Sequence, residues 1–341
     1  MLLTFLTAGF LLLYAALILF YYTQWKKVEN YQPASSTPSV FISVVIAARN
    51  EEHSLPHLIS DLLAQDYPVH LWEAIIINDY STDSTAELVS TLTGSNMRMV
   101  LPAVLSTESS KKRAIETGVN YAKGELIVIT DADCRVGPYW VSTIAKFYEE
   151  KGAAFIAAPV KFSHDNSVLQ IFQSLDFITL QGITAASVSA NFHAMCNGAN
   201  LAYTKQAFAI VNGFEGIDKV ATGDDMLLMH KIWKNTPGKV YYLKSKEATV
   251  STEPMKTWKD FFMQRKRWAS KTLVYDDYRI IIVLAFILLL NALFFVLLIE
   301  AIINKTYWIH CVAFLVGKTI IEWPFVFSVA KFYDEQKLMR Y

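Results

Sequence analysis

The stretch "GELIVITDADC", residues 124–134, indicates both the fold class and the position of the chemistry. Its first half is a short run of mostly β-branched apolar residues, which predicts a buried strand. Two aspartates, Asp131 and Asp133, then follow with Ala132 between them. A buried strand has no use for paired carboxylates, so we expect both of them just beyond its carboxyl end.

The composition is that of a neutral chain. The 341 residues include 31 lysines and arginines and 31 aspartates and glutamates, so the formal net charge is zero. This balance argues against a nucleic-acid-binding protein, which usually carries a basic excess. The three cysteines, Cys134, Cys196 and Cys311, are too few and too widely spaced to predict a disulfide framework or a zinc site.

Hydrophobic residues make up 53% of the chain and gather in three segments, residues 1–24, 279–303 and 306–331. Each segment is long enough to cross a bilayer as a helix. The first has no basic start and no clear cleavage site, so we interpret it as an uncleaved transmembrane anchor rather than a secretory signal. Lys318 and Glu322 lie one turn apart in the third segment, either as a functional intramembrane pair or simply neutralising each other.

Basic residues flank these segments unevenly. They gather after the first and before the second segment, at Lys26, Lys27, Arg265, Lys266, Arg267, Lys271 and Arg279. The short loop between the second and third segments has only Lys305. The positive-inside rule then predicts a cytoplasmic soluble domain, a cytoplasmic tail at 332–341 and an N-terminus outside the cytoplasm.

Strand-like and helix-like stretches alternate between the first two apolar segments. The strand-like runs are 42–48, 74–77, 97–101, 126–130 and 154–158, and the helix-like stretches lie near 51–64, 83–92, 109–122 and 138–149. This order predicts an α/β domain whose mostly parallel sheet is covered by helices on both faces. Such sheets bind ligands beyond the carboxyl ends of their strands.

Polar groups follow three of these strands, in Arg49-Asn50-Glu51, Asn78-Asp79 and Asp131-Ala132-Asp133. The sequence has no G-x-G-x-x-G and no G-x-x-x-x-G-K-[ST], so bound phosphates would need another neutralising group. Mg²⁺ or Mn²⁺ held by Asp131 and Asp133 would provide it. A helix cap or a turn explains the same two aspartates equally well.

An apolar strand followed by D-x-D is typical of two enzyme classes. The stretch resembles haloacid-dehalogenase-like phosphatases, in which Asp131 would be the nucleophile and Gly223-Asp224-Asp225 a later acidic motif. Those enzymes have threonine or valine where this chain has Arg135, and their motif lies near the start of the domain. The phosphatase is therefore the weaker enzyme alternative, and a membrane scaffold without catalysis is the non-enzymatic one.

Five motifs occur in a consistent order: "VVIAARNEE" (44–52), "INDYSTDST" (77–85), "SSKKRAIETGVNYAKGELIVITDAD" (109–133), "TGDDMLLMHKI" (222–232) and "QRKRW" (264–268). Together they resemble the nucleotide-sugar glycosyltransferases of family 2, which have a GT-A fold. The last motif resembles the Q-x-x-R-W signature of the membrane-embedded branch, which includes cellulose, chitin and hyaluronan synthases and ceramide glucosyltransferase. The chain departs from many relatives in having Asn78-Asp79 instead of two aspartates, and G-D-D instead of E-D.

The resemblance implies a membrane-anchored, inverting and metal-dependent hexosyltransferase. It would move a sugar from a nucleotide-sugar, expected to be a UDP-sugar, to a hydroxyl of a lipid-linked or polysaccharide acceptor. Three spans are fewer than a polymer channel uses, which favours a lipid-linked acceptor unless the chain forms a homo-oligomer. We expect a role in glycolipid or cell-envelope polysaccharide biosynthesis at the bacterial inner membrane, with membrane lipids and no nucleic acid among its partners.

The resemblance also implies a domain order. A linker at 25–40 precedes the GT-A domain at 41–255, and an amphipathic interfacial helix with the QRKRW motif follows at 256–278. On this helix Gln264, Arg267 and Trp268 lie within an arc of roughly 100°. Arg267 would pair with the diphosphate, and Trp268 would stack against the acceptor.

Several residues acquire donor-side roles from the resemblance. Asp133 would bind the metal directly, Asp131 would contact the ribose or the metal shell, and Asp79 would hydrogen-bond the base. An Asx-turn is the competing explanation for Asp79. The remaining expected donor contacts are Ala48, Arg49, Asn50, Glu51, Lys111, Lys112 and Ala132, although a lysine pair on a helix is more often just solvated.

The resemblance implies that Asp225, beside Asp224, is the general base that accepts the proton of the attacking hydroxyl. An acidic pair that opens a helix also compensates the helix dipole, and both roles can be true of one residue. "MCNGAN" (195–200) resembles the acceptor-side loop of the synthases. It places Cys196, Asn197 and Gly198 near the sugar.

Overall fold

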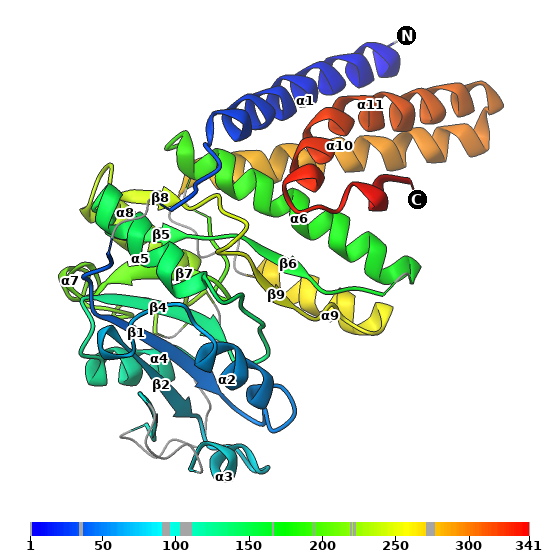
Figure 1. Ribbon diagram of the computed structural model, residues 1–341. Coiled ribbons are helices and arrows are strands. Elements are labelled where there is room, and N and C mark those ends of the chain that lie inside the picture. Colours follow the sequence, from blue (N-terminus) through cyan, green and yellow to red (C-terminus); the bar gives the residue numbers. More distant parts are fainter. Residues whose placement is uncertain are drawn as a thin grey trace.

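An α/β domain carries three long helices that extend away from it (Figure 1). The computed structural model describes residues 2–33, 37–90, 96–102, 111–165, 167–193, 195–218, 220, 223–270 and 277–340. The long helices are α1 (Leu2–Lys27), α10 (Tyr278–Ile303) and α11 (Trp308–Phe332). All three lie side by side in Figure 1, on the same side of the domain.

Within the described residues, the central sheet has seven strands in the order β3-β2-β1-β4-β7-β5-β8. Their bounds are β1 (Ile42–Ala48), β2 (Trp72–Asn78), β3 (Met97–Val100), β4 (Leu126–Asp131), β5 (Phe155–Ala157), β7 (Leu201–Thr204) and β8 (Val240–Tyr242). The first four strands are parallel neighbours, whereas β7 runs antiparallel to both β4 and β5. The predicted mostly parallel α/β sheet is therefore confirmed, with β7 as the exception.

The strand residues alternate between two cores, as the pleat of a strand requires. Val44 belongs to the core that contains Leu58 of α2 (Leu55–Leu63) and Ile144 of α5 (Trp140–Lys151). Its neighbour Val45 belongs to the core that contains Ile115 of α4 (Lys111–Tyr121). Together with α3 (Thr85–Ser90), these helices match the four predicted helical stretches, and both faces of the sheet are covered.

The longest helix of the α/β domain was not predicted from the sequence. α6 (Val168–Ser189) is 22 residues long and lies against both α1 and α11, so it joins the domain to the apolar helices. Its buried positions include polar or small residues such as Gln173, Ser174 and Gly182, which interrupt any apolar periodicity. Gln173 can be buried because its side-chain amide is satisfied by the backbone of Met255. It donates to the Met255 carbonyl at 2.9 Å and accepts from the Met255 N–H at 3.0 Å.

A second, smaller sheet lies apart from the seven-stranded one. β6 (Val160–Phe162) pairs in parallel with β9 (Val250–Thr252), and α9 (Trp258–Ala269) follows. The predicted interfacial helix at 256–278 is therefore shorter, because helical structure begins only at Trp258 and residues 271–276 lie outside the described part of the chain. The other short helices are η1 (Val69–Leu71), α7 (Lys205–Ile210), α8 (Met226–Asn235), η3 (Lys305–Tyr307) and η4 (Gln336–Arg340).

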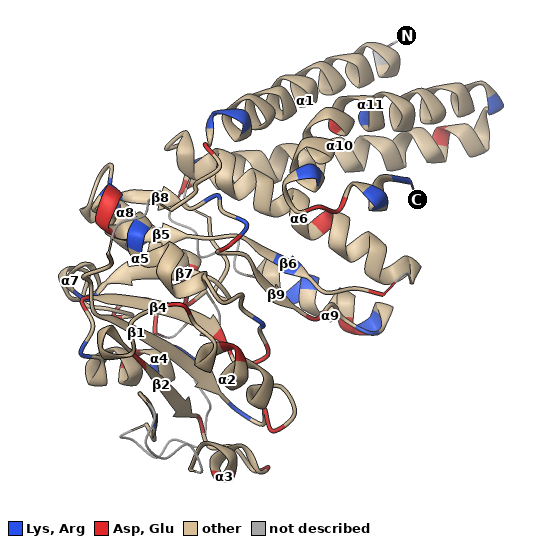
Figure 2. Cartoon of the chain, in the orientation of Figure 1, with Lys and Arg blue, Asp and Glu red and all other residues tan. Residues whose placement is uncertain are grey.

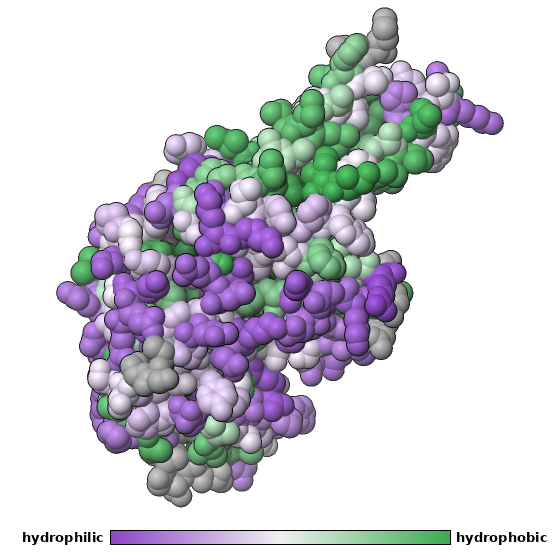
Figure 3. Space-filling view, turned by 45° about the horizontal axis from the view of Figure 1, so that its top comes forward, coloured by the Kyte–Doolittle hydropathy of each residue, from purple (hydrophilic) through white to green (hydrophobic). Residues whose placement is uncertain are grey.

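By length and composition, the helices at 3–27, 278–303 and 305–332 are each able to cross a membrane. Hydrophobic surface covers the part of the molecule that they form (Figure 3), whereas most charged residues lie on the α/β domain (Figure 2). Lys318 and Glu322 form an ion pair at 2.5 Å. The hydroxyl of Tyr14 in α1 donates to the same Glu322 carboxylate, so this pair also links α1 to α11.

Gly182 lies where α6 and α11 approach each other closely. A Cβ at this position would overlap the side chain of Val329 and lie 3.1 Å from Cζ of Phe325. We expect Gly182→Val to lower the free energy of unfolding by about 1–3 kcal/mol, because the added methyl groups have no room. Thermal unfolding in one detergent measures this. Gly9→Val in α1 is the matched control, since no atom lies within 4 Å of its Cβ position; equal shifts for both variants would contradict the packing argument.

Candidate active site

The carboxyl ends of β1, β2 and β4 meet at one edge of the sheet because these strands are parallel neighbours. Asp131 is the last residue of β4 and pairs in register with Ala47 of β1, so it does not lie just past the strand as predicted. Asp133 follows two residues later, after the buried Ala132. The two aspartates still lie together at this edge, since β4 ends at the first of them.

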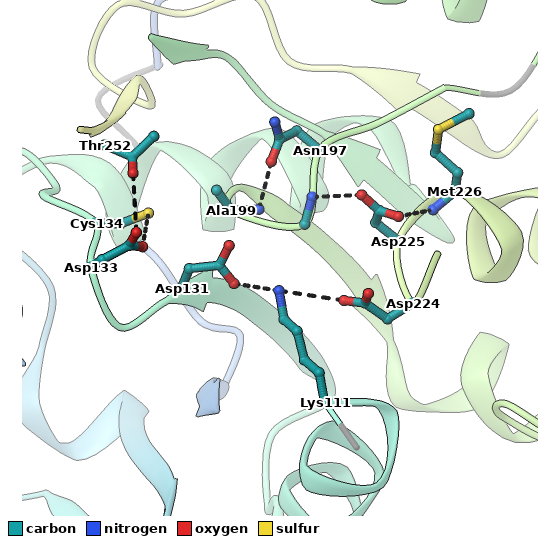
Figure 4. A network of polar contacts seen from close by, with 11 residues as sticks. Lys111, Asp131, Asp133, Cys134, Asn197, Ala199, Asp224, Asp225, Met226 and Thr252 are labelled. Carbon is teal, nitrogen blue, oxygen red and sulfur yellow. Dashed lines mark hydrogen bonds and ion pairs between the residues drawn. The ribbon is translucent and has the colours of Figure 1, made fainter. Parts of the chain in front are cut away.

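Lys111, the first residue of α4, connects two acidic segments at this edge. Its ammonium nitrogen lies 2.5 Å from Oδ1 of Asp131 and 3.5 Å from Oδ2 of Asp224 (Figure 4). Burial alone lowers the pKa of Lys111, but the charges of Asp131 and Asp224 outweigh it and raise the pKa above its ordinary value. The lysine is therefore a charged group that holds the two carboxylates around it.

Asp225 has the capping role that the sequence allowed. It is the N-cap of α8, and its Oδ1 accepts a hydrogen bond from the backbone N–H of Met226 at 2.7 Å. Its Oδ2 accepts a second bond from the backbone N–H of Gly198 at 3.1 Å. The carboxylate is thus fixed by backbone donors from two different segments (Figure 4).

Gly198 lies at the centre of this constellation. A Cβ built on it would lie 3.4 Å from Nζ of Lys111, 3.5 Å from Oδ2 of Asp224 and 3.6 Å from Cβ of Asp225. Beside it, Oδ1 of Asn197 accepts a hydrogen bond from the N–H of Ala199 at 2.9 Å. The half-buried Cys196 packs against the core. The structure therefore brings the loop at 196–198 next to the acidic residues.

Asp133 has contacts that the sequence did not reveal. The hydroxyl of Thr252, at the end of β9, donates to its Oδ2 at 3.4 Å, and the thiol of Cys134 lies 3.7 Å from its Oδ1 (Figure 4). Burial raises the pKa of Asp133, and the charge of Asp131 raises it further. Burial likewise raises the pKa of Glu51, with Asp133 as the next cause. Several carboxylates thus lie close together at this edge, and Lys111 offsets only part of their negative charge.

A divalent cation suits this edge chemically. Within the described residues, no group of three or more histidine, cysteine, aspartate or glutamate side chains is arranged to hold a metal ion. Asp131 and Asp133 supply oxygen donors only, and their mutual repulsion would be relieved by a bound cation. Mg²⁺ and Mn²⁺ accept such sites when one or two carboxylates are completed by water and phosphate oxygens.

The loops after β1 and β2 are tied to each other. The backbone N–H of Asn50 donates to Oγ of Ser81 at 3.0 Å, and Oδ1 of Asn50 accepts from the N–H of Thr82 at 2.8 Å. Asn78 forms the turn before Ser81, since its Oδ1 accepts from the Ser81 N–H at 3.0 Å. The buried Asp79 donates its N–H to the carbonyl of Ala48 at 2.9 Å. Two predicted donor-side segments are therefore one connected surface.

The other predicted donor-side residues differ from one another in exposure and in their contacts. Arg49 is exposed and Glu51 is half-buried, with its N–H bound to Oγ1 of Thr85 at 2.8 Å. The ammonium of Lys112 points elsewhere, and donates to the carbonyls of Ile217 and Val220 at 2.5 and 2.6 Å. Of the two lysines, only Lys111 is brought to the aspartates by the contacts described above.

The QRKRW motif lies on α9, which docks against α6. Arg265 forms an ion pair with Asp176 of α6, and its guanidinium lies 4.5 Å from the ring centre of Trp268. Trp268 in turn lies 6.2 Å from the ring of Phe177. Arg267 is exposed and Gln264 is half-buried. Arg265 was not among the predicted site residues, although its spacing of three residues before Trp268 places both on one helical face.

Two family models match the chain. The model "Glycosyl transferase family 2" matches residues 43–203, and "Glycosyl transferase family group 2" matches residues 126–325, which is more than half of the chain. The phosphatase interpretation of Asp131 is therefore wrong.

Curated relatives agree with this assignment. "Probable glycosyltransferase YdaM" of Bacillus subtilis (strain 168) is 25% identical over 300 residues, which cover 86% of this chain and 67% of that protein. "Undecaprenyl-phosphate 4-deoxy-4-formamido-L-arabinose transferase" of Shewanella sediminis (strain HAW-EB3) is 32% identical over 111 residues. This match covers 32% of the chain and 34% of that relative.

A solved structure supports the fold. The "Mannosyltransferase PcManGT from Pyrobaculum calidifontis in complex with GDP-Man and Mn2+" superposes with a TM-score of 0.55 at 17% identity, over 94% of this chain and 96% of that chain. Taken with the mostly parallel sheet and the family matches, this shows that the chain belongs to glycosyl transferase family 2 and has a GT-A fold.

Proposed function

We propose that this chain is a membrane-anchored, inverting glycosyltransferase that moves a sugar from a nucleotide-sugar to a hydroxyl of a lipid-linked acceptor. The observation that carries the proposal is the convergence of two acidic pairs at the carboxyl edge of the sheet. Asp131 and Asp133 come from the end of β4, while Asp224 and Asp225 precede α8. Lys111 and Gly198 join the two pairs.

The donor side would consist of the carboxyl ends of β1, β2 and β4. Asp79 would bind the base, and Asp131 and Asp133 would hold Mg²⁺ or Mn²⁺, which would neutralise the diphosphate as it leaves. The solved mannosyltransferase holds Mn²⁺ together with its nucleotide-sugar, which supports a divalent cation here. A UDP-sugar is the donor that we expect from the sequence motifs. The exposed Arg49 stands at the edge of this surface.

The acceptor side is formed by the loop at 196–198 and the start of α8. In the reaction, the acceptor hydroxyl attacks the anomeric carbon, the bond to the nucleoside diphosphate breaks, and the hydroxyl proton passes to Asp225. The two backbone hydrogen bonds to Asp225 fix its carboxylate without occupying all its lone pairs. It can therefore accept a proton without first being repositioned.

Features of α9 and α6 support a lipid-linked acceptor. Trp258, Phe262 and Met263 of α9 expose 48%, 63% and 60% of their surfaces. Phe172 of α6 lies 6.0 Å from Trp258 and extends this apolar surface. Both helices extend from the domain on the same side as the three apolar helices (Figure 1), as an interfacial helix pair would. The relative named for undecaprenyl phosphate agrees with an acceptor of this class.

The direct test is a screen of UDP- and GDP-sugars with the purified full chain, lipid extract and Mn²⁺ or Mg²⁺. We expect release of the nucleoside diphosphate with one donor, its loss on chelation of the cation, and a labelled product that partitions into organic solvent. Absence of release with every donor would contradict the proposed transfer. A long water-soluble polymer as the only product would contradict the lipid acceptor alone.

Substitution of the general base gives a second prediction. Asp225→Asn should lower kcat by about two to four orders of magnitude, because asparagine cannot accept the proton. Asparagine can still accept the cap bond from the N–H of Met226 but loses the bond from the N–H of Gly198, so we expect a small fall in the thermal unfolding midpoint while nucleotide binding stays near that of the unchanged protein. Turnover close to that of the unchanged chain would remove Asp225 from the mechanism.

The basic residues at the domain end of α1 predict a topology. Lys26 and Lys27 end α1 next to the domain, while Lys305 lies between α10 and α11. We expect a reporter that works only in the cytoplasm to be active at the C-terminus and inactive at the N-terminus. An active reporter at the N-terminus would overturn this orientation and the cytoplasmic placement of the site.

A further inference from the structure

Lys111 lies between a proposed metal ligand, Asp131, and Asp224. Its ammonium lies 2.5 Å from Oδ1 of Asp131, one of the two proposed metal ligands. It also lies 3.5 Å from Asp224, beside the proposed base. The carboxylate of Asp131 therefore binds an ammonium in this structure, and the same carboxylate would bind a divalent cation in the donor complex.

Neighbouring residues build this position. Lys112 is buried and bonded to the carbonyls of Ile217 and Val220, which fixes the first turn of α4 and the direction of its neighbour. Gly198 leaves room for the ammonium, since a Cβ there would lie only 3.4 Å from the Lys111 nitrogen. The side chain of Lys111 remains 36% exposed, so it can exchange partners without a change in the fold.

We propose that Lys111 is a resident counter-ion that binds Asp131 before the donor arrives and moves to the diphosphate when it binds, so that nucleotide and cation bind cooperatively. This inference rests on the proposed function and adds to it the order in which Lys111 changes partners when the donor binds. Without nucleotide, a cation must displace the ammonium from Asp131. With nucleotide, the negative diphosphate offers Lys111 a new partner and leaves Asp131 to the cation.

The coupling has a thermodynamic signature. If the nucleotide increases cation affinity by some factor, then the cation increases nucleotide affinity by the same factor. Part of this factor comes from direct contact between the cation and the phosphates, which does not involve Lys111. The contribution of Lys111 to this factor is measured as the decrease in the factor when a neutral residue replaces Lys111.

The experiment measures Mn²⁺ binding to the full chain in detergent by electron paramagnetic resonance of the free ion, without turnover. In the absence of nucleotide, we expect Lys111→Gln and Lys111→Met to bind Mn²⁺ about fivefold more tightly or better than the unchanged protein. Lys111→Arg, which keeps the charge, should retain the weak affinity. With UDP or GDP added, the gain in Mn²⁺ affinity should be smaller in the two neutral variants.

Lys123→Gln is the matched control. It removes the same charge from an exposed lysine, but it lies just before β4 and thus at the opposite edge of the sheet from Asp131. It should bind Mn²⁺ like the unchanged protein. Thermal unfolding of every variant in the same detergent checks that each one is folded.

The proposal is overturned if the neutral variants bind Mn²⁺ no more tightly than the unchanged chain, or if Lys111→Arg gains affinity as they do. Failure of the proposed function would be recognised by a different result, namely that the unchanged chain releases no diphosphate from any donor. Binding of Mn²⁺ does not require transfer, so the two results are independent.

Discussion

Repulsion among carboxylates at one edge of the sheet is the constraint on which the site depends. Parallel strands end together, so Glu51, Asp131 and Asp133 cannot avoid one another, and the pKa of Glu51 and that of Asp133 are raised by burial and by neighbouring charge. Without a ligand, Lys111 offsets part of this charge through Asp131 and Asp224. A site of this kind is stable but charged, which suits a ligand that brings both a cation and a diphosphate.

The segment that precedes the loop at 196–198 contacts the apolar helices as well as the domain. Arg279, in the first turn of α10, donates to the carbonyl of Asn191 at 3.1 Å. His193 lies 3.3 Å from the hydroxyl of Tyr21 in α1. A few residues further on, Gly198 donates to Asp225. The position of the proposed base is therefore set in part by helices long enough to cross a membrane.

The sequence predicted the elements whose pattern is local. The buried strands were evident from their apolar runs, and Asp131 and Asp133 from their place at the end of one of them, although Asp131 is still part of that strand. α6 was missed because polar and small residues such as Gln173 and Gly182 are buried by tertiary contacts that no periodicity reveals. Two adjacent lysines on one helix point about 100° apart, so only the fold could distinguish Lys111 from Lys112.

The proposed site has a donor half and an acceptor half, and this division would let a water-soluble donor meet the proposed lipid acceptor. The donor half comes from the parallel strands that begin the domain. The acceptor half comes after α6, which lies against α1 and α11. Lys111 contacts one carboxylate from each half, Asp131 and Asp224. If its ammonium moves to another partner, the charge next to both carboxylates changes. Arrival of the donor would thereby alter the charge beside Asp225 before any acceptor is bound.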